Sequence, residues 1–408
     1  MSMNDKSLYI LGQLLFTGFS FLFNMAAARA LGPQSMGSWQ TILLISSYAP
    51  ALCVGIVNGL GRELPVSLGQ ERPEIAREIV ATCFRVVMGI ALCLLFLIPF
   101  VARLPGVESL FLATIVFGLS AARIVHVFSA MLLRSLQQFS RLGLHQALSA
   151  LILAVAIGVL QWNPTLLVVA VGMTGSFVLA SVTAAPLVSL SGASLSRASA
   201  LIRSGLPIYA AGLLFMLLGS TDRWLILYFL GTESLGLYTP AILAFAIITV
   251  SPMLVSNIKY PHLGYLYGKH KSASKLLPEI RRIVLLNLGF SGAVAIIGFL
   301  TMYYVVIPFV LPEYKDGLKS MAIIFIGGLV LPIGQSFGDL FNAIGRQRIY
   351  LRSMGAGLIV NIVSGGFLLG LADWGLEGVA VGTLAGMTVF SILQVSAYCI
   401  VLREAESG

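Results

Sequence analysis

This sequence contains very little charge. Of its 408 residues only 10% are charged and 58% are hydrophobic, whereas a soluble globular domain carries roughly 25% charged residues. The composition excludes an ordinary soluble domain and predicts an integral membrane protein.

Cysteine and histidine are also scarce, with four of each. The cysteines Cys53, Cys83, Cys93 and Cys399 have no metal-ligand spacing, so neither disulfides nor zinc are expected. The histidines are dispersed along the chain. The sequence contains no glycine-rich phosphate loop followed by lysine, which excludes an ATPase of that type. We therefore expect no catalytic residues and no cofactor, and no enzyme activity.

Long apolar segments occupy most of the chain. Each is about 20 residues long, the length that spans a bilayer as a helix. The predicted membrane segments are 8–30, 38–58, 79–103, 109–131, 141–161, 165–189, 205–230, 235–257, 283–307, 318–340, 351–371 and 377–401. We interpret the first as a retained span, because its apolar stretch is too long for a typical signal peptide.

The basic residues predict an orientation. If the N-terminus is cytoplasmic, the cytoplasmic side receives Lys6, Arg62, Arg72, Arg77, Arg134, Arg141, Arg197, Arg203, Lys259, Lys269, Lys271, Lys275, Arg281, Arg282, Arg346, Arg348, Arg352 and Arg403. The outer side receives Arg29, Arg103, Lys315 and Lys319, and Arg85, Arg123 and Arg223 lie within segments. This asymmetry predicts cytoplasmic termini in the plasma (bacterial inner) membrane. It also explains the net charge of +9 without nucleic acid, through contact with anionic membrane lipids.

The first half of the chain recurs weakly 199 residues later. Leu31–Trp39 aligns with Leu230–Tyr238, with the leucine, both glycines and the serine identical. The same offset pairs Leu44 with Leu243, Asn58 with Asn257, Leu64 with Leu263 and Gly69 with Gly268. The repeat predicts an N-terminal six-helix lobe (1–190), a cytoplasmic linker (191–204) and a C-terminal six-helix lobe (205–408), an architecture typical of transporters.

Two cytoplasmic segments follow the second span of each lobe, Gly61–Glu78 and Lys259–Arg282. They are interpreted as interfacial helices, with solvated loops as the alternative.

Five loose motifs follow one another in a specific order: Ala28–Pro33 with Gly37, Asn58–Gly69, Asp222-Arg223 through Gly231, Gly236–Tyr238, and Gly345–Gln347. Their order resembles the polysaccharide-lipid flippases, the polysaccharide transporter branch of the multidrug/oligosaccharidyl-lipid/polysaccharide (MOP) exporter superfamily. The resemblance implies an all-α membrane fold of about twelve helices, in two pseudo-symmetric six-helix lobes that form a MATE/MOP-like V around a central cavity.

The resemblance also implies a function. The expected activity is translocation of an isoprenoid-pyrophosphate-linked oligosaccharide to the outer leaflet by alternating access, for O-antigen, capsule or exopolysaccharide synthesis. A polysaccharide polymerase and chain-length machinery are the protein partners it would imply. Two alternatives stay open: a cation-coupled multidrug exporter of the same superfamily, and a membrane glycan polymerase or ligase. The first six segments contain arginines but no carboxylates, which favours an anionic substrate, and the short outer loops disfavour the polymerase.

A polar stripe marks the first segment. Gln13, Thr17, Ser20 and Asn24 are spaced by four, three and four residues, which places them on one helical face. They are interpreted as lining the substrate cavity, with hydrogen bonding between helices as the alternative. The 199-residue offset places Arg223 at the position of Asn24 and Asp222 at that of Phe23, and both Arg223 and Asp222 are included among the candidates for the substrate cavity.

Arg223 is the main candidate for binding substrate. A charge within a membrane segment is costly and usually faces protein or water, and a guanidinium offers paired donors to a pyrophosphate. The alternative is a structural partnership with Asp222.

The other candidates are less specific. Arg123 and His126 lie one turn apart and either bind substrate or reach toward the headgroups. Arg29 is a gating or anchoring candidate at the outer turn. Asp339 either pairs with an arginine such as Arg346 or carries a coupling proton.

Prolines and glycines predict where the segments bend. Pro50 and Pro252 are expected to interrupt the second and eighth segments, which makes them gating candidates. Gly37 and Gly236 lie in the outer turns, and we expect a positive φ in at least one of them.

Overall fold

The protein is described here by a computed structural model that covers residues 3–104, 106–188, 192–270 and 276–407. These residues are about 90% helical and contain no strand. Within them, eleven helical segments are long and apolar enough to cross a membrane. The first, Ser7–Cys53, covers the first predicted segment and most of the second, and the other ten overlap the remaining predictions in order. The span found for the predicted segment 205–230 is Leu195–Leu218, which begins earlier and ends before Arg223. The all-α membrane fold is therefore confirmed.

The chain forms two compact units, Met1–Gly212 and Leu213–Gly408. Their boundary lies inside helix α8 (Leu195–Leu218), a few residues beyond the predicted linker.

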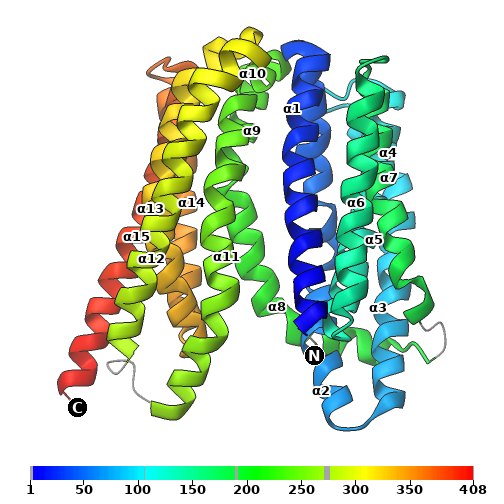
Figure 1. Cartoon of the computed structure of the whole chain (residues 1–408), viewed down its shortest axis with the longest axis vertical. Helices are drawn as coiled ribbons and strands as arrows, with labels where there is room; N and C mark the ends of the chain where they lie inside the picture. Colours follow the sequence, from blue (N-terminus) through cyan, green and yellow to red (C-terminus); the bar gives the residue numbers. More distant parts are fainter. Residues whose placement is uncertain (1–2, 105, 189–191, 271–275, 408) are drawn as a thin grey trace. The chain divides into compact units, whose positions relative to one another are not determined.

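In unit 1 the long helices run side by side (Figure 1). The helices of unit 1 are α1 (Met3–Ser47), α2 (Ile56–Gly69), α3 (Pro73–Cys93), the four-residue α4 (Ile98–Val101), α5 (Leu110–Ser135), α6 (Phe139–Leu160), α7 (Leu166–Ser181) and the first part of α8. Short 3₁₀ turns, η1 (Ala49–Cys53), η2 (Leu94–Leu97) and η3 (Val182–Leu187), connect or extend them.

Unit 2 is also built from helices. It contains α9 (Thr221–Phe229), α10 (Gly231–Leu237), α11 (Thr239–His270), α12 (Leu277–Thr301), α13 (Leu318–Ala343), α14 (Gln347–Gly370) and α15 (Gly375–Ser407). A π-helical stretch, η5 (Met302–Val310), extends α12, and a 3₁₀ turn, η6 (Pro312–Gly317), leads into α13.

Glycines allow the closest helix pairs in each unit. In unit 1 a Cβ on Gly12 of α1 would collide with the backbone of Gly143 of α6. In unit 2 a Cβ on Gly382 of α15 would lie 2.5 Å from Cα of Gly365 on α14. Small residues at such contacts let the backbones of two apolar helices come into direct contact, which is a common way for helices to associate in membranes.

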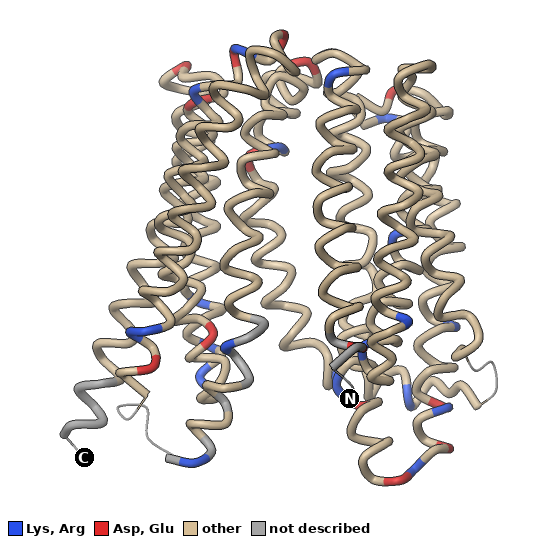
Figure 2. The backbone as a smooth tube through the Cα atoms, in the orientation of Figure 1, with Lys and Arg blue, Asp and Glu red and all other residues tan. Residues whose placement is uncertain are grey.

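Charged residues gather toward the ends of the helices in both units, with few along the middle (Figure 2). The first predicted cytoplasmic segment is helical, as α2 and the start of α3 with a turn between them. In the second, α11 continues to His270 and α12 begins at Leu277, and part of the connection lies outside the described residues.

Each of the two predicted outer turns contains a glycine with a positive φ, at aligned positions of the repeat. These glycines are not the two that were predicted. Gly37 and Gly236 are helical, and the positive φ values belong to Gly32 (67°) and Gly231 (84°), which are 199 residues apart. In the first repeat Pro33 follows, and a proline disfavours helical geometry in the residue before it. The prediction of a positive φ at Gly37 or Gly236 was therefore wrong.

The two prolines behave differently. After Pro50, the backbone leaves helical geometry at Val54 (φ 40°) and Gly55 (φ 80°), so the second segment is interrupted as predicted. Pro252 lies inside a continuous α11, which corrects the expected interruption of the eighth segment. An apolar helix tolerates a proline when its neighbours pack against the weakened turn, and α12 and α13 both pack on α11.

Candidate functional site

The polar stripe of α1 forms local hydrogen bonds along one face. Gln13 Nε2 donates to Thr17 Oγ1 at 3.4 Å, and Asn24 Nδ2 donates to the carbonyl oxygen of Ser20 at 2.8 Å. All four side chains are half-buried. The four side chains therefore lie on one helix face, as their spacing predicts. Part of their hydrogen-bonding capacity is used by contacts within α1.

In unit 2 the corresponding helix is broken just before Arg223. Helix α8 ends at Leu218 and α9 begins at Thr221. Asn361, which is fully buried on α14, donates to the carbonyl oxygen of Leu218 at 3.1 Å. The hydroxyls of Ser220 and Thr221 donate back to the last turn of α8, at 2.6 and 2.7 Å. Side chains thus satisfy carbonyl groups that the broken helix leaves free.

Asp222 is held by two hydrogen bonds inside the unit. Its side chain is only 3% exposed. Oδ1 accepts from the backbone N–H of Arg223 at 2.8 Å, and Oδ2 accepts from the hydroxyl of Tyr238 at 3.1 Å. Both carboxylate oxygens are therefore engaged, as a buried polar group requires.

The guanidinium of Arg223 is directed elsewhere. Nη2 donates to the carbonyl oxygen of Gly219 at 3.2 Å, and Nε is buried without a hydrogen-bond partner in the described part of the chain. No described carboxylate lies within ion-pair distance of this guanidinium. Asp222 forms its hydrogen bond with the backbone of Arg223 and not with the guanidinium, although the two charges are close enough to attract each other. Arg223 therefore keeps hydrogen-bond donors for a further acceptor.

The repeat gives Asn24 and Arg223 the same contact. Each donates from its side chain to the carbonyl oxygen four residues before it, Ser20 in α1 and Gly219 after α8. The aromatic residues Trp39 and Tyr238 also correspond, and both are fully buried. The units differ at Phe23 and Asp222, where an apolar side chain in unit 1 is replaced by a carboxylate in unit 2.

In unit 1 the structure joins two histidines that the sequence analysis treated as dispersed. The rings of His126 on α5 and His145 on α6 are stacked, with centroids 4.5 Å apart. His145 Nδ1 lies 2.8 Å from the carbonyl oxygen of Ala180, which fixes its ring. The interpretation of the histidines as dispersed was wrong, because residues on neighbouring helices meet regardless of their separation in sequence. The polar His145-Gln146 pair within an apolar segment was the available signal.

His126 is buried, so it does not extend toward the headgroups as an exposed side chain would. Its ring contacts Phe177 on α7, at 4.7 Å between centroids, and Phe16 on α1, at 6.0 Å. Arg123, one turn away on α5, is half-buried. The two residues share a helix face, but His126 is buried and Arg123 is partly exposed.

The two remaining charged candidates, Arg29 and Asp339, differ in burial. Arg29 is exposed on α1. Asp339 on α13 is 8% exposed and accepts a hydrogen bond from the hydroxyl of Ser256 on α11. A separate buried network joins α12 and α13, in which Asn287 Nδ2 donates to Ser336 Oγ at 3.0 Å. Unit 2 thus contains two groups of buried polar residues that single-residue arguments did not find.

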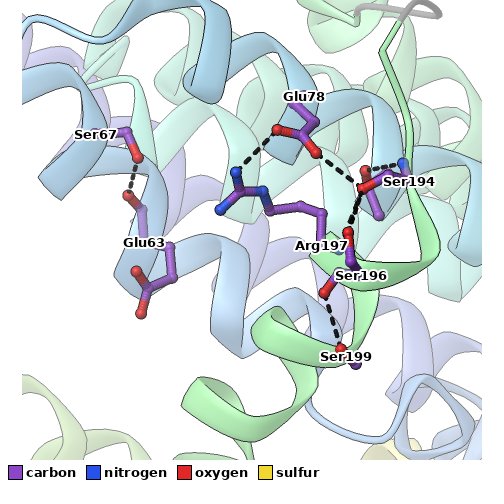
Figure 3. Close-up of polar contacts among 8 residues, drawn as sticks. Glu63, Ser67, Glu78, Ser194, Ser196, Arg197 and Ser199 are labelled. Carbon is purple, nitrogen blue, oxygen red and sulfur yellow. Dashed lines mark hydrogen bonds and ion pairs between the residues drawn. The ribbon is translucent and has the colours of Figure 1, made fainter.

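The start of α8 is fixed to unit 1 by a compact polar cluster (Figure 3). Arg197 forms an ion pair with Glu78 of α3, with Nη2 and Oε2 2.9 Å apart, and Ser194 Oγ donates to the other carboxylate oxygen at 2.9 Å. The backbone N–H of Ser194 donates to Thr82 Oγ1 at 3.2 Å. The basic pattern of the sequence predicts only a cytoplasmic position for Arg197, and the sequence gives no sign of this attachment.

Comparison with known proteins shows a likeness of structure. No protein-family model matches the chain, and no curated protein matches it either. Among solved structures, the inward-facing conformation of a multidrug resistance MATE family transporter of the MOP superfamily is 15% identical, with a TM-score of 0.72. The alignment covers 100% of this chain and 96% of that chain.

Two further structures have the same fold. The outward-facing conformation of a multidrug resistance MATE family transporter is 17% identical over 99% of this chain and 97% of that chain, with a TM-score of 0.66. A MOP superfamily transporter from Pyrococcus furiosus, whose structure is described as having a reverse polarity of the binding pocket, is 16% identical over 98% and 96%, with a TM-score of 0.66. This chain therefore has the all-helical fold of the MATE transporters of the MOP superfamily.

Proposed function

We propose that this protein is a flippase that moves an isoprenoid-pyrophosphate-linked oligosaccharide across the membrane by alternating access. The fold supports transport, because both inward-facing and outward-facing transporters align with nearly the whole chain. The substrate is proposed from the residues of the candidate site, above all from Arg223.

The observation that carries the proposal is the arrangement at the start of α9. Arg223 lies within a predicted membrane segment, and its guanidinium donates only to a backbone carbonyl among the contacts that the structure describes. A permanently charged group in such a segment requires an anionic or polar partner. Guanidinium donors match the oxygens of a phosphate or pyrophosphate, which makes an anionic lipid headgroup the best fit.

The composition of unit 1 supports the same substrate class. Its predicted segments contain Arg85 and Arg123 and no carboxylate deep in the membrane. The polar stripe on α1 adds neutral side chains that suit a sugar hydroxyl. The Pyrococcus furiosus transporter, described as having a reverse polarity of the binding pocket that suggests a different function, supports the idea that pocket polarity varies within this fold.

A cation-coupled multidrug exporter is the second candidate. The buried carboxylate of Asp339 favours it, because drug exporters use carboxylates inside the membrane to bind cations. Asp339 lies in unit 2 and is hydrogen-bonded to Ser256. In the flippase proposal Asp339 has a coupling role instead.

The test is a transport assay with the full chain reconstituted in liposomes. An isoprenoid-pyrophosphate-linked oligosaccharide with a labelled sugar is placed in one leaflet, and its appearance in the other is measured with a membrane-impermeant quencher. The proposal predicts protein-dependent translocation that is lost in Arg223→Ala. Arg348→Ala is the matched control, because Arg348 is an exposed arginine outside the site.

The same liposomes distinguish the second candidate. Efflux of a cationic dye driven by a proton or sodium gradient, together with no movement of the lipid-linked sugar, would overturn the flippase and support the drug exporter. Translocation of the lipid that is unchanged in Arg223→Ala would leave the flippase standing and remove Arg223 from substrate binding.

A further inference from the structure

A basic hollow lies between α11 and the start of α12 in unit 2. It is open to solvent, has a volume of about 560 Å³, and is lined by Lys259 from α11 and by Pro278, Arg281, Arg282, Leu285 and Leu286 from α12. Three cationic side chains thus surround one concave site, at the end of unit 2 that the basic residues predict to be cytoplasmic. Neither the polar stripe nor the Arg223 site includes any of these residues.

The cations of this hollow are only partly neutralised. Lys259 Nζ lies 3.4 Å from Oε1 of Glu279, and His262 Nε2 lies 3.8 Å from the same oxygen. Arg281 and Arg282 are exposed and have no ion-pair partner among the described residues. Glu279 therefore fixes Lys259, while the two arginines retain their charge for a ligand.

The lining changes from charged to apolar within one helical turn. Arg281 and Arg282 are each followed four residues later by a leucine, Leu285 and Leu286, and these leucines are 60% and 50% exposed. One turn of α-helix rises about 5.4 Å. A ligand that spans this step needs an anionic group at one end and hydrocarbon at the other.

A second hollow continues the apolar side. It has a volume of about 240 Å³ and shares Arg281 and Leu285 with the first. Its other walls are apolar residues of α12 together with Phe337 of α13 and Tyr398 of α15. The two hollows meet at the same arginine and leucine, so a headgroup in one is adjacent to space for an acyl chain in the other.

We infer that this pair of hollows is a binding site for an anionic phospholipid of the cytoplasmic leaflet. The phosphate contacts Lys259, Arg281 and Arg282, and an acyl chain lies along Leu285 into the second hollow. Basic pockets between membrane helices on the cytoplasmic side bind anionic headgroups for this reason. The inference concerns a bound membrane lipid and does not depend on the proposed transport substrate.

The test measures lipid binding to the purified full chain by native mass spectrometry, with phosphatidylglycerol and phosphatidylcholine as probes. We expect phosphatidylglycerol to bind in preference to phosphatidylcholine. Arg281→Gln/Arg282→Gln should weaken phosphatidylglycerol binding at least about tenfold, since each basic residue near an anionic surface contributes about 1 kcal/mol. Arg348→Gln/Arg352→Gln is the matched control, because it removes the same charge from exposed positions of α14 in the same unit.

Leu285→Ser separates a lipid from a free anion. It should also weaken phosphatidylglycerol binding, and millimolar inorganic phosphate should not displace the lipid from the unmodified protein. Gel filtration confirms that each variant elutes as the unmodified protein does, and Arg282→Gln alone provides a milder test of the same site.

Three results would overturn the inference. Equal weakening by the control pair would mean that the lipid responds only to overall charge. Full displacement by inorganic phosphate would identify a phosphate site without lipid. Displacement by an equimolar isoprenoid pyrophosphate, with no preference for phosphatidylglycerol over phosphatidylcholine, would assign the hollow to the transported substrate.

Discussion

The hydroxyl of Tyr238 donates a 3.1 Å hydrogen bond to Oδ2 of Asp222, a carboxylate that is 3% exposed. At the corresponding positions of unit 1 the chain has Trp39 and Phe23, which cannot form this bond. The bond links the start of α9 to the turn between α10 and α11. It therefore fixes the backbone from which Arg223 projects.

Removal of this hydroxyl should destabilise unit 2. Tyr238→Phe leaves one oxygen of a buried carboxylate without its donor, at a cost of about 1–3 kcal/mol. Thermal unfolding in detergent should show a lower Tm for Tyr238→Phe and for Asp222→Asn. The double variant should lose less than the sum of the two, because the residues share one interaction. Strictly additive losses would show that the bond contributes nothing.

The left-handed glycine of the second repeat gives a second prediction. Gly231 has a φ of 84°, and a Cβ there would meet open space. Gly231→Ala should therefore lower stability through backbone conformation alone, by about 1 kcal/mol. The control is Gly289→Ala in α12, where a Cβ also meets nothing within 4 Å and the backbone is helical. There alanine should be neutral or stabilising, and equal losses at both sites would refute the explanation.

The attachment of α8 to unit 1 gives a third prediction. The side chains of Arg197 and Glu78 are 30% and 26% exposed, so solvent screens their ion pair and it should contribute no more than about 1 kcal/mol. A double-mutant cycle of Glu78→Gln and Arg197→Gln, followed by thermal unfolding, should give a coupling energy of that size that decreases at high salt. Glu63→Gln, a neighbouring carboxylate with no described ion pair, is the control and should show no coupling to Arg197→Gln.

The stacked histidines of unit 1 give a fourth prediction. His145 is fully buried, and its ring is bound to the carbonyl oxygen of Ala180. His145→Ala should leave a cavity beside His126, with a loss of about 2–5 kcal/mol, while the carbonyl oxygen of Ala180 keeps the hydrogen bond from the Thr183 hydroxyl at 2.7 Å. His262→Ala, at an exposed position of α11, should change the Tm little. A small effect of His145→Ala would mean that the unit does not depend on the pair.

Much of the fold could be predicted from the sequence because membrane segments are long and uniform in hydrophobicity. The repeat also located both outer turns, since glycine marks backbone geometry. It did not identify the correct glycine, because each turn contains two aligned glycines, Gly32 with Gly37 and Gly231 with Gly236, and the alignment does not distinguish them.

The candidate site was harder to predict. Spacing placed Gln13 through Asn24 on one face, but the break before Arg223 depends on Asn361, 143 residues away from the carbonyl that it binds. The neighbours of His126 likewise come from other helices. Periodicity describes one helix at a time, and contacts between helices depend on how those helices pack.

The most direct test of the central claim is the affinity of the purified protein for a short-chain isoprenoid pyrophosphate. Arg223→Ala should weaken binding at least about tenfold, the effect of losing charge-assisted hydrogen bonds worth 1.5–3 kcal/mol. Arg223→Lys should recover only part of the affinity, because an ammonium cannot reproduce the paired donors of a guanidinium. Arg348→Ala should bind as the unmodified protein does. Unchanged affinity in a folded Arg223→Ala would contradict the account.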